Sequence, residues 1–476
     1  MPTVNQVEVE SAVDRSRQAL WDRFASRVQV NSALTRALVS YQSNRGRAYY
    51  RWFKYKEGFS AGLIEYLLAK LAGQSGVLLD PFAGSGAALF AARDLGWNCR
   101  GIELLPVGVT LTQARLAAEA LAPGQFKEAV RQFLESNWSE RTDPSLLFRH
   151  IRITANAFPK ETEDAIASFR TYVRDRLGDP AIRMLFETAC LSTLEAVSYT
   201  RKDGQYLRWD ERASRELRGK RFSKGHIPPF ATAISKQLQM MAEDLESRDL
   251  FSDLECSPTG TVEVTEGSCL DVLLTLPRAS IDVVITSPPY CNRYDYTRTY
   301  ALELAFLGVN ETTLRELRQC LLSCTVENKE KVGQLAKKYE EANATHRYVS
   351  AIRAFDQQAA LQEVLRLLES AGRQGQLNNS NIPRMVRNYF LESSVVIHEL
   401  ARIVRPNGHV VMVNDNVQYI GQEIPVDLIL SDMAEKAGFV TKHIWTLGRG
   451  KGNSSQQMGA HGRNELRKCA YVWRKE

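Results

Sequence analysis

The sequence has no run of apolar residues that approaches the roughly 18 needed to cross a bilayer. Its first residues, Met-Pro-Thr-Val-Asn-Gln-Val-Glu, do not form a basic segment followed by an apolar one, so no secretory signal is expected. None of the 7 histidines shows the spacing of metal ligands or of a catalytic triad, and we expect no metal site. From these absences we expect no membrane partner and a cytoplasmic protein.

Cysteine is also sparse and unpatterned. The chain has 8 cysteines in 476 residues, and only Cys320 and Cys324 lie close together in the sequence. No second pair of cysteines or histidines follows them at metal-ligand spacing. This excludes a disulfide framework, and we expect reduced, mostly buried thiols.

What remains is the composition of an ordinary folded protein. Hydrophobic residues make up 44% and charged residues 24% of the chain, which excludes a disordered or fibrous protein. The 61 Lys and Arg residues exceed the 55 Asp and Glu residues, and a net charge of +6 only permits a polyanionic partner. At roughly 150 residues per domain, the length allows two or three domains or one enlarged core with insertions.

Strand patterns in the sequence are separated by long helical blocks. A short apolar strand at 77–79, a small-residue helix at 87–95 and a strand at 98–102 form a β-α-β unit, which favours a parallel sheet. Strand patterns return at 261–265, 281–285 and 409–413. We expect one α/β core with two large helical insertions. The expected boundaries are an N-terminal helical segment at 1–48, a core at 49–107, 256–307 and 393–476, and helical insertions at 108–255 and 308–392.

The first chemical signal is a glycine loop, Asp-Pro-Phe-Ala-Gly-Ser-Gly at 80–86, between a strand and a helix. Its glycines allow a sharp turn and the close approach of a ligand. Leu89 replaces the third glycine of the dinucleotide fingerprint, so a pyrophosphate is not expected. Asp80 suits a cationic amine, and Glu103, at the end of the next strand, suits ribose hydroxyls. Amine plus ribose describes S-adenosylmethionine; the alternative is a turn without function beside a solvated acid.

The second signal is Thr-Ser-Pro-Pro-Tyr at 286–290, after another apolar strand. A nucleobase amine is a poor nucleophile, because its lone pair is delocalised into the ring. The Ser287 side-chain oxygen and the Pro288 carbonyl can accept hydrogen bonds from the amine and favour a pyramidal nitrogen. Tyr290 can stack on a base extruded from its helix, which contributes roughly 1–3 kcal/mol. The alternative is a Pro-Pro strand terminator followed by a buried tyrosine.

Together the two segments resemble motifs I and IV of the DNA amino-methyltransferases, which modify adenine N6 or cytosine N4. Three further stretches resemble other motifs of that family: 55–68 resembles motif X, 267–285 the run from motif III into motif IV, and 400–410 motif VI. The resemblance covers about half of the chain. It implies a Rossmann-like methyltransferase core with a mixed, mostly parallel, seven-stranded sheet.

The resemblance also implies roles for individual residues. S-adenosylmethionine would be held by Asp80, Pro81, Phe82, Gly84, Ser85, Gly86 and Glu103, and the target base by the catalytic residues Ser287, Pro288, Pro289 and Tyr290. Ser268 stands where motif III usually has an aspartate that contacts the cofactor adenine. The serine before Pro-Pro is commoner in cytosine-N4 enzymes, whereas adenine-N6 enzymes more often have Asp or Asn. Cytosine N4 is therefore favoured over adenine N6.

A third signal is electrostatic. Nine basic residues, four acids and three aromatic residues lie between Arg201 and Lys224. Phosphate contacts from such a stretch would supply salt-dependent affinity for DNA, which makes the first insertion the candidate for target recognition. The candidate DNA-binding residues are Arg201, Lys202, Arg218, Lys220 and Arg221. The alternative is a solvated helical face, with the aromatic residues in the core of the insertion.

Other activities share parts of this pattern. They are an adenine-N6 DNA methyltransferase, an RNA amino-methyltransferase and a catalytically silent DNA-binding subunit of the same fold. The sequence has no recognisable RNA-binding module, and its intact Ser-Pro-Pro-Tyr disfavours a silent subunit. The expected partner is double-stranded DNA. The resemblance is compatible with a restriction-modification or phage-defence role, and the sequence leaves open whether a cognate restriction endonuclease accompanies the protein. Nothing in the sequence indicates the oligomeric state.

Overall fold

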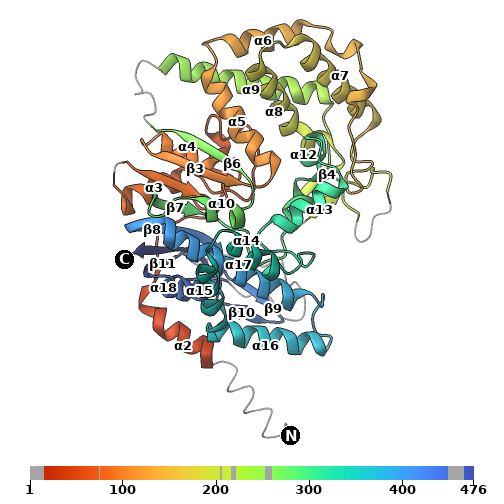
Figure 1. The fold of residues 1–476 in the computed structure, drawn as a ribbon. Coiled ribbons are helices and arrows are strands. Elements are labelled where there is room, and N and C mark those ends of the chain that lie inside the picture. The colour runs from red at the N-terminus through yellow and green to blue at the C-terminus, as the bar shows by residue number, and fades with distance from the viewer. Residues whose placement is uncertain (1–14, 74, 204–205, 216–220, 252–259, 449–465) are drawn as a thin grey trace.

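The computed structural model describes residues 15–73, 75–203, 206–215, 221–251, 260–448 and 466–476. Within them one large sheet runs through the molecule (Figure 1). Its strands are β1 (Val28–Val30), β2 (Val77–Asp80), β3 (Asn98–Glu103), β6 (Val262–Glu266), β7 (Ile281–Thr286), β8 (Val404–Asp415), β11 (Phe439–Thr446) and β12 (Lys468–Lys475). The order is β1-β11-β12-β8-β7-β2-β3-β6, and only β12 runs antiparallel to its neighbours. The expected α/β fold with a mixed, mostly parallel sheet is confirmed.

The sheet has an eighth strand that the sequence analysis did not predict. Strand β1 comes from the N-terminal segment, for which only helices were expected, and it pairs in parallel with β11. It is three residues long, and its sequence Val-Gln-Val is too short to show an alternating pattern. Val30 is 68% exposed, so the strand adds little to the core.

Helices cover both faces of the sheet. Helices α3 (Ala61–Leu71) and α4 (Ala87–Arg93) pack on one face, in a cluster that includes the β7 residues Val283 and Ile285. The intervening residue Val284 faces the opposite cluster, because side chains alternate along a strand. That cluster includes α2 (Arg15–Phe24), α10 (Cys269–Thr275), α17 (Ile382–Ile403) and α18 (Val426–Lys436). Burial on both faces explains why β7 is an almost continuous apolar run.

The first helical block forms a second hydrophobic core, which lies above the sheet in Figure 1. Its elements are α5 (Pro106–Ala120), α6 (Gln125–Glu135), α7 (Lys160–Arg176), α8 (Pro180–Val197), α9 (Phe230–Phe251) and a hairpin of β4 (Thr200–Asp203) and β5 (Tyr206–Trp209). Helices α11 (Tyr296–Thr299) and α12 (Ala301–Phe306), which follow the Ser-Pro-Pro-Tyr segment, contact this block. The hairpin was not predicted, because this part of the chain was expected to be mainly helical.

The second helical block packs on the helices α17, α18 and α2, which cover one face of the sheet. Its helices are α13 (Glu311–Cys320), α14 (Val332–Glu341), α15 (Thr345–Asp356) and α16 (Ala359–Arg373). Tyr339 of α14 and Phe355 of α15 belong to the same buried cluster as Met412 and Tyr471 of the sheet. A small hairpin, β9 (Val417–Tyr419) and β10 (Gln422–Ile424), follows β8. Among the described helices none is long and apolar enough to cross a membrane.

Candidate active site

The glycine loop at the end of β2 is held in place by the carboxylate of Glu103. The Gly84 N–H donates to Glu103 Oε2 at 2.6 Å, and the Leu105 N–H donates to Oε1 at 2.7 Å. Gly84 has a φ of +54°, and a Cβ there would lie 2.9 Å from the Tyr55 ring. Only glycine therefore fits, and the loop passes close under the segment that resembles motif X.

The two loops singled out in the sequence meet at one edge of the sheet. Strands β2 and β7 are parallel neighbours, so their carboxyl ends lie side by side. Thr286 Oγ1 donates a hydrogen bond of 2.6 Å to Asp80 Oδ1, which joins the end of β7 to the start of the glycine loop. The predicted convergence of the two segments is present in the structure.

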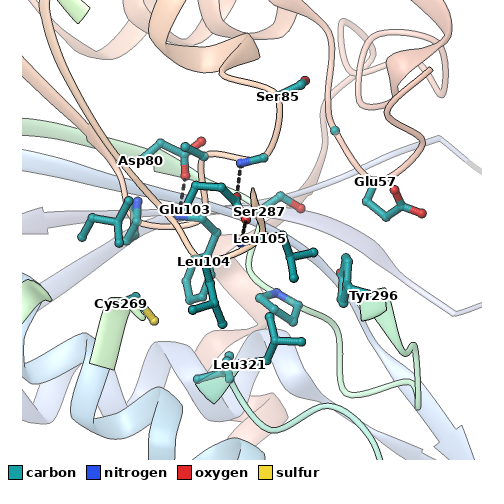
Figure 2. Close-up of a pocket in the computed structure, with 18 of the residues that line it drawn as sticks. Glu57, Asp80, Ser85, Glu103, Leu104, Leu105, Cys269, Ser287, Tyr296 and Leu321 are labelled. Atoms are coloured by element: carbon teal, nitrogen blue, oxygen red, sulfur yellow. Dashed lines mark hydrogen bonds between the residues drawn. The ribbon is translucent and has the colours of Figure 1, made fainter. Parts of the chain in front are cut away.

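A pocket of about 770 Å³ opens where the loops meet (Figure 2). Eight of the predicted site residues line it: Asp80, Pro81, Phe82, Gly84, Ser85, Glu103, Ser287 and Pro289. Three do not: Gly86, which caps helix α4, and Pro288 and Tyr290. In Figure 2, Cys269 and Leu321 lie at one end of the pocket and Glu57 and Tyr296 at the other.

The lining of this pocket is acidic. It contains the carboxylates of Glu57, Asp80 and Glu103, and no lysine, arginine or histidine among the described residues. Such a wall favours a ligand of positive charge. Two of the lone-pair directions on the Glu103 carboxylate are used by backbone N–H groups, and the remaining ones can accept from two hydroxyls. These features fit S-adenosylmethionine, which has a sulfonium, an amine and a ribose diol.

Burial shifts the acidity of the two carboxylates at the strand ends. Asp80 is 2% exposed, and burial raises its pKa to about 7 although hydrogen bonds from Thr286 and Phe82 lower it. Glu103 is 7% exposed, and burial likewise raises its pKa to about 7 against hydrogen bonds from Leu105 and Gly84. Without a bound cation both groups are thus partly protonated near neutral pH.

Cofactor affinity should therefore depend on pH. A cation favours the ionised carboxylates, so its binding releases protons when the pH is near or below about 7. We expect the affinity for S-adenosylmethionine to fall as the pH drops from about 8 to about 6, and to level off above that range. Calorimetry in buffers of different ionisation enthalpy measures both quantities, and a constant affinity without proton release would contradict the assignment.

The Ser-Pro-Pro-Tyr segment presents its residues to two sides. Ser287 and Pro289 face the pocket, whereas Tyr290 lies on the side of β8 and β12, near Asp415. The Tyr290 hydroxyl is 3.3 Å from Ser287 Oγ, and burial raises the pKa of the phenol. Ser287 therefore stands between the pocket and the tyrosine ring. The Pro288 carbonyl accepts no hydrogen bond from the residues that the structure describes.

Comparison with known proteins identifies the family. The chain is 44% identical over 468 residues to the Type II methyltransferase M.AvaI of Nostoc sp. and of Anabaena variabilis, an alignment that covers 97% of this chain and 94% of each relative. It is 39% identical over 463 residues to the Type II methyltransferase M.BsoBI of Geobacillus stearothermophilus. This alignment covers 94% of this chain and 90% of the relative. The chain belongs to the Type II methyltransferases. The resemblance to DNA methyltransferases is thereby confirmed, although no protein-family profile and no solved structure gives a significant match.

The pocket of this Type II methyltransferase has a wall that the sequence analysis missed. Residues 320–322, at the end of α13 in the second helical block, line the end of the pocket that contains Cys269. Ser268 also lines it, and its hydroxyl donates to the Cys320 carbonyl at 2.8 Å. The serine thus fixes the position of the chain segment that closes this end. No local pattern in the sequence indicates such a contact between distant segments.

Glu57 and Tyr296 are also pocket residues that were not singled out. Glu57 accepts hydrogen bonds from the hydroxyls of Tyr294 and Tyr300, which lie just after the Ser-Pro-Pro-Tyr segment. The Tyr55 and Tyr300 rings stack at a centroid distance of 5.0 Å. These contacts tie the motif X segment to the chain that follows the Ser-Pro-Pro-Tyr segment. The density of tyrosines at 290–300 was the available signal.

The basic stretch of the first helical block is only partly exposed. Arg201 on β4 and Arg221 are exposed, as a phosphate contact requires. Lys202 is 3% exposed and forms a buried ion pair of 2.5 Å with Glu303 of α12, so its predicted contact with DNA is wrong. It packs over the Tyr300 ring instead, because β4 buries every second side chain. Arg218 and Lys220 lie outside the described residues.

The sequence analysis also made predictions about metal sites and about the burial of the cysteines. Within the described ranges no three His, Cys, Asp or Glu side chains are grouped so that they could hold a metal ion. Seven free cysteines are described, of which Cys320 is exposed and the other six are buried. The thiols are therefore mostly buried, as expected.

Proposed function

We propose that this Type II methyltransferase transfers a methyl group from S-adenosylmethionine to an exocyclic amine of a flipped base in double-stranded DNA, and that the base is cytosine, methylated at N4. The family supports site-specific DNA methylation. The observation that carries the proposal is the acidic pocket of about 770 Å³ between the glycine loop and the Ser-Pro-Pro-Tyr segment. A cation-binding wall beside a set of hydrogen-bond acceptors is what this reaction requires.

Asp80 and Glu103 are the residues that would hold S-adenosylmethionine. When bound, the cofactor supplies a methyl group activated by its positively charged sulfur. Glu103 would accept from the ribose hydroxyls, and Asp80 would offset the positive charge from a nearly water-free position. Apolar side chains of Ile102, Leu104 and Leu322 also line the pocket and suit an aromatic ring.

Ser287 and Pro288 are the residues that would prepare the nucleophile. When the Ser287 hydroxyl donates to the Tyr290 oxygen, its own lone pairs stay free to accept from one N–H of the base amine. The Pro288 carbonyl would accept from the other, and the proline ring has no N–H that competes for it. The amine lone pair is then directed away from the base ring, and the Tyr290 ring supports the extruded base by stacking.

The choice of cytosine N4 rests on one residue. Ser287 precedes Pro-Pro, and in this family a serine at that position is commoner in cytosine-N4 enzymes, whereas adenine-N6 enzymes more often have Asp or Asn. The Type II relatives also support a cognate restriction endonuclease as a partner in restriction-modification. Resistance of DNA methylated by this protein to cleavage in lysates of its host would test that partner.

Labelled S-adenosylmethionine tests the reaction. The protein is incubated with duplex DNA of diverse sequence and, in a separate reaction, with RNA, and each product is digested to nucleosides for mass spectrometry. We expect label in N4-methylcytosine. Label in N6-methyladenine would overturn the assignment of the base, and label in RNA but not DNA would indicate the RNA enzyme. Cofactor binding without transfer to any DNA would indicate a silent subunit.

A further inference from the structure

A second cavity adjoins the cofactor pocket. It measures about 1160 Å³ and shares Tyr55, Gly58, Phe59 and Ser85 with the first pocket. The segment 55–59 therefore separates the two cavities. The second cavity is otherwise formed by residues 41–54 and by helices α5 and α8 of the first helical block.

The electrostatic character of this second cavity is opposite to that of the first. Its described lining contains four cationic side chains and no Asp or Glu, whereas the first has three carboxylates and no cation. The cations are Arg45, Arg51, Lys54 and Arg115. The lining is also rich in aromatic rings, which are those of Tyr41, Tyr49, Tyr50, Trp52 and Phe53. A ligand of this cavity should be both aromatic and anionic.

Two of the four cations remain available to a ligand. Arg51 is paired with Asp244, and the Arg115 guanidinium lies between the Tyr50 and Phe90 rings while it contacts nearby acids. Arg45 and Lys54 are exposed, and neither forms an ion pair with a carboxylate of the described residues. Lys54 interacts electrostatically with the Glu195 carboxylate but forms no direct ion pair with it, so an anionic group beside Arg45 or Lys54 would still meet positive charge.

A third observation points to a missing polar partner. Thr188 on α8 lines the cavity and is 1% exposed, yet its hydroxyl has no hydrogen-bond partner among the described residues. A buried hydroxyl without a partner is costly, so such groups normally meet a ligand or an ordered water. The hydroxyl itself has almost no accessible surface, so it meets an occupant of the cavity when the Thr188 side chain rotates toward it.

We propose that the second cavity binds a nucleotide unit, an aromatic base that carries a phosphate. The aromatic rings provide stacking surfaces, Arg45 and Lys54 bind the phosphate, and the Thr188 hydroxyl bonds to the base or sugar. The unit has two sources, a nucleotide of the DNA strand or a free nucleotide. The first source rests on the proposed function, because it requires DNA to enter the active site; the second does not.

Two variants test the cavity. R45Q/K54Q removes the free charges, and T188V removes the orphan hydroxyl without a change of charge or shape. The matched control is K442Q, which removes an exposed lysine from β11, away from both cavities. Affinities for dCMP and dAMP are measured by calorimetry, and those for labelled duplex and single-stranded DNA by fluorescence anisotropy, all with S-adenosylhomocysteine at saturation.

We expect T188V to keep or raise the melting temperature and to weaken nucleotide binding about fivefold to tenfold, the loss of one hydrogen bond. If both variants bind mononucleotides more weakly, the occupant of the cavity is a free nucleotide. If the protein binds no mononucleotide and both variants bind DNA more weakly, the occupant is a nucleotide of the DNA strand. If R45Q/K54Q weakens DNA binding but T188V does not, surface charge alone acts and the proposal is overturned, as it is if neither variant has an effect. Affinities need no methyl transfer, so failure of the cavity and failure of the proposed reaction are distinguishable.

Discussion

Glu103→Gln is expected to weaken S-adenosylmethionine binding by at least about 100-fold, because hydrogen bonds to a charged group contribute roughly 1.5–3 kcal/mol each. Both carboxylate oxygens of Glu103 accept backbone hydrogen bonds, from Gly84 and Leu105. A glutamine must point its amide N–H₂ at one of these backbone donors, so one of the two hydrogen bonds is lost. The ribose of the cofactor also loses a hydrogen-bond acceptor. The negative charge that offsets the cation is lost as well.

The measurement is calorimetric titration with S-adenosylmethionine and with S-adenosylhomocysteine, beside the melting temperature of each variant. Glu263→Gln is the matched control, since Glu263 lies on the adjacent strand β6 and is exposed. We expect the control to bind like the parent protein. An affinity of E103Q within about threefold of the parent would show that Glu103 only stabilises the loop.

The position of this site follows from the sequence because of a simple geometric rule. Both chemical segments come directly after apolar strands, and the carboxyl ends of parallel neighbours lie at one edge of a sheet. Asp80 and Ser287 could thus be placed in one pocket without knowledge of the 200 residues between them. The hydrogen bond from Thr286 to Asp80 is the structural result of that rule.

The rest of the site could not be predicted, because it depends on contacts between distant parts of the chain. Residues 320–322 close one end of the pocket from a helical block that matched no motif. Glu57 meets the hydroxyls of Tyr294 and Tyr300 across more than 230 residues of sequence. The exposure of basic residues could not be predicted either. A basic stretch of sequence does not reveal that the hairpin buries Lys202 in an ion pair.

The pKa values of the Asp80 and Glu103 carboxyl groups depend on burial, which a sequence motif does not reveal. The pattern of residues predicts that Asp80 and Glu103 hold S-adenosylmethionine, but it says nothing of their protonation. In the structure their burial raises both pKa values to about 7, so the same groups that would bind a cation also make its binding sensitive to pH. Among the described residues, the charged side chains that line the first cavity are all carboxylates, and those that line the second cavity are all cationic. The two cavities can therefore sort ligands by charge.

Tyr290→Ala is expected to lower kcat/KM for DNA by about 5-fold to 150-fold, which corresponds to the roughly 1–3 kcal/mol of a base-aromatic stack. Tyr290 does not line the cofactor pocket, so the affinity for S-adenosylmethionine should stay within about twofold. Tyr290→Phe keeps the ring and loses only the 3.3 Å contact with Ser287 Oγ, and we expect it to retain most of the activity. Because burial raises the pKa of this phenol, its ionisation should not enter the pH profile.

Steady-state kinetics with duplex DNA measures turnover, and the fluorescence of a 2-aminopurine placed next to the target cytosine measures base extrusion separately. If the ring supports the extruded base, the alanine variant loses both signals and the phenylalanine variant neither. Equal losses in the two variants would mean that the hydroxyl acts through Ser287 rather than the ring through stacking. Loss of cofactor binding in Y290A would instead show that the segment 287–290 cannot be divided into a side for the cofactor and a side for the base.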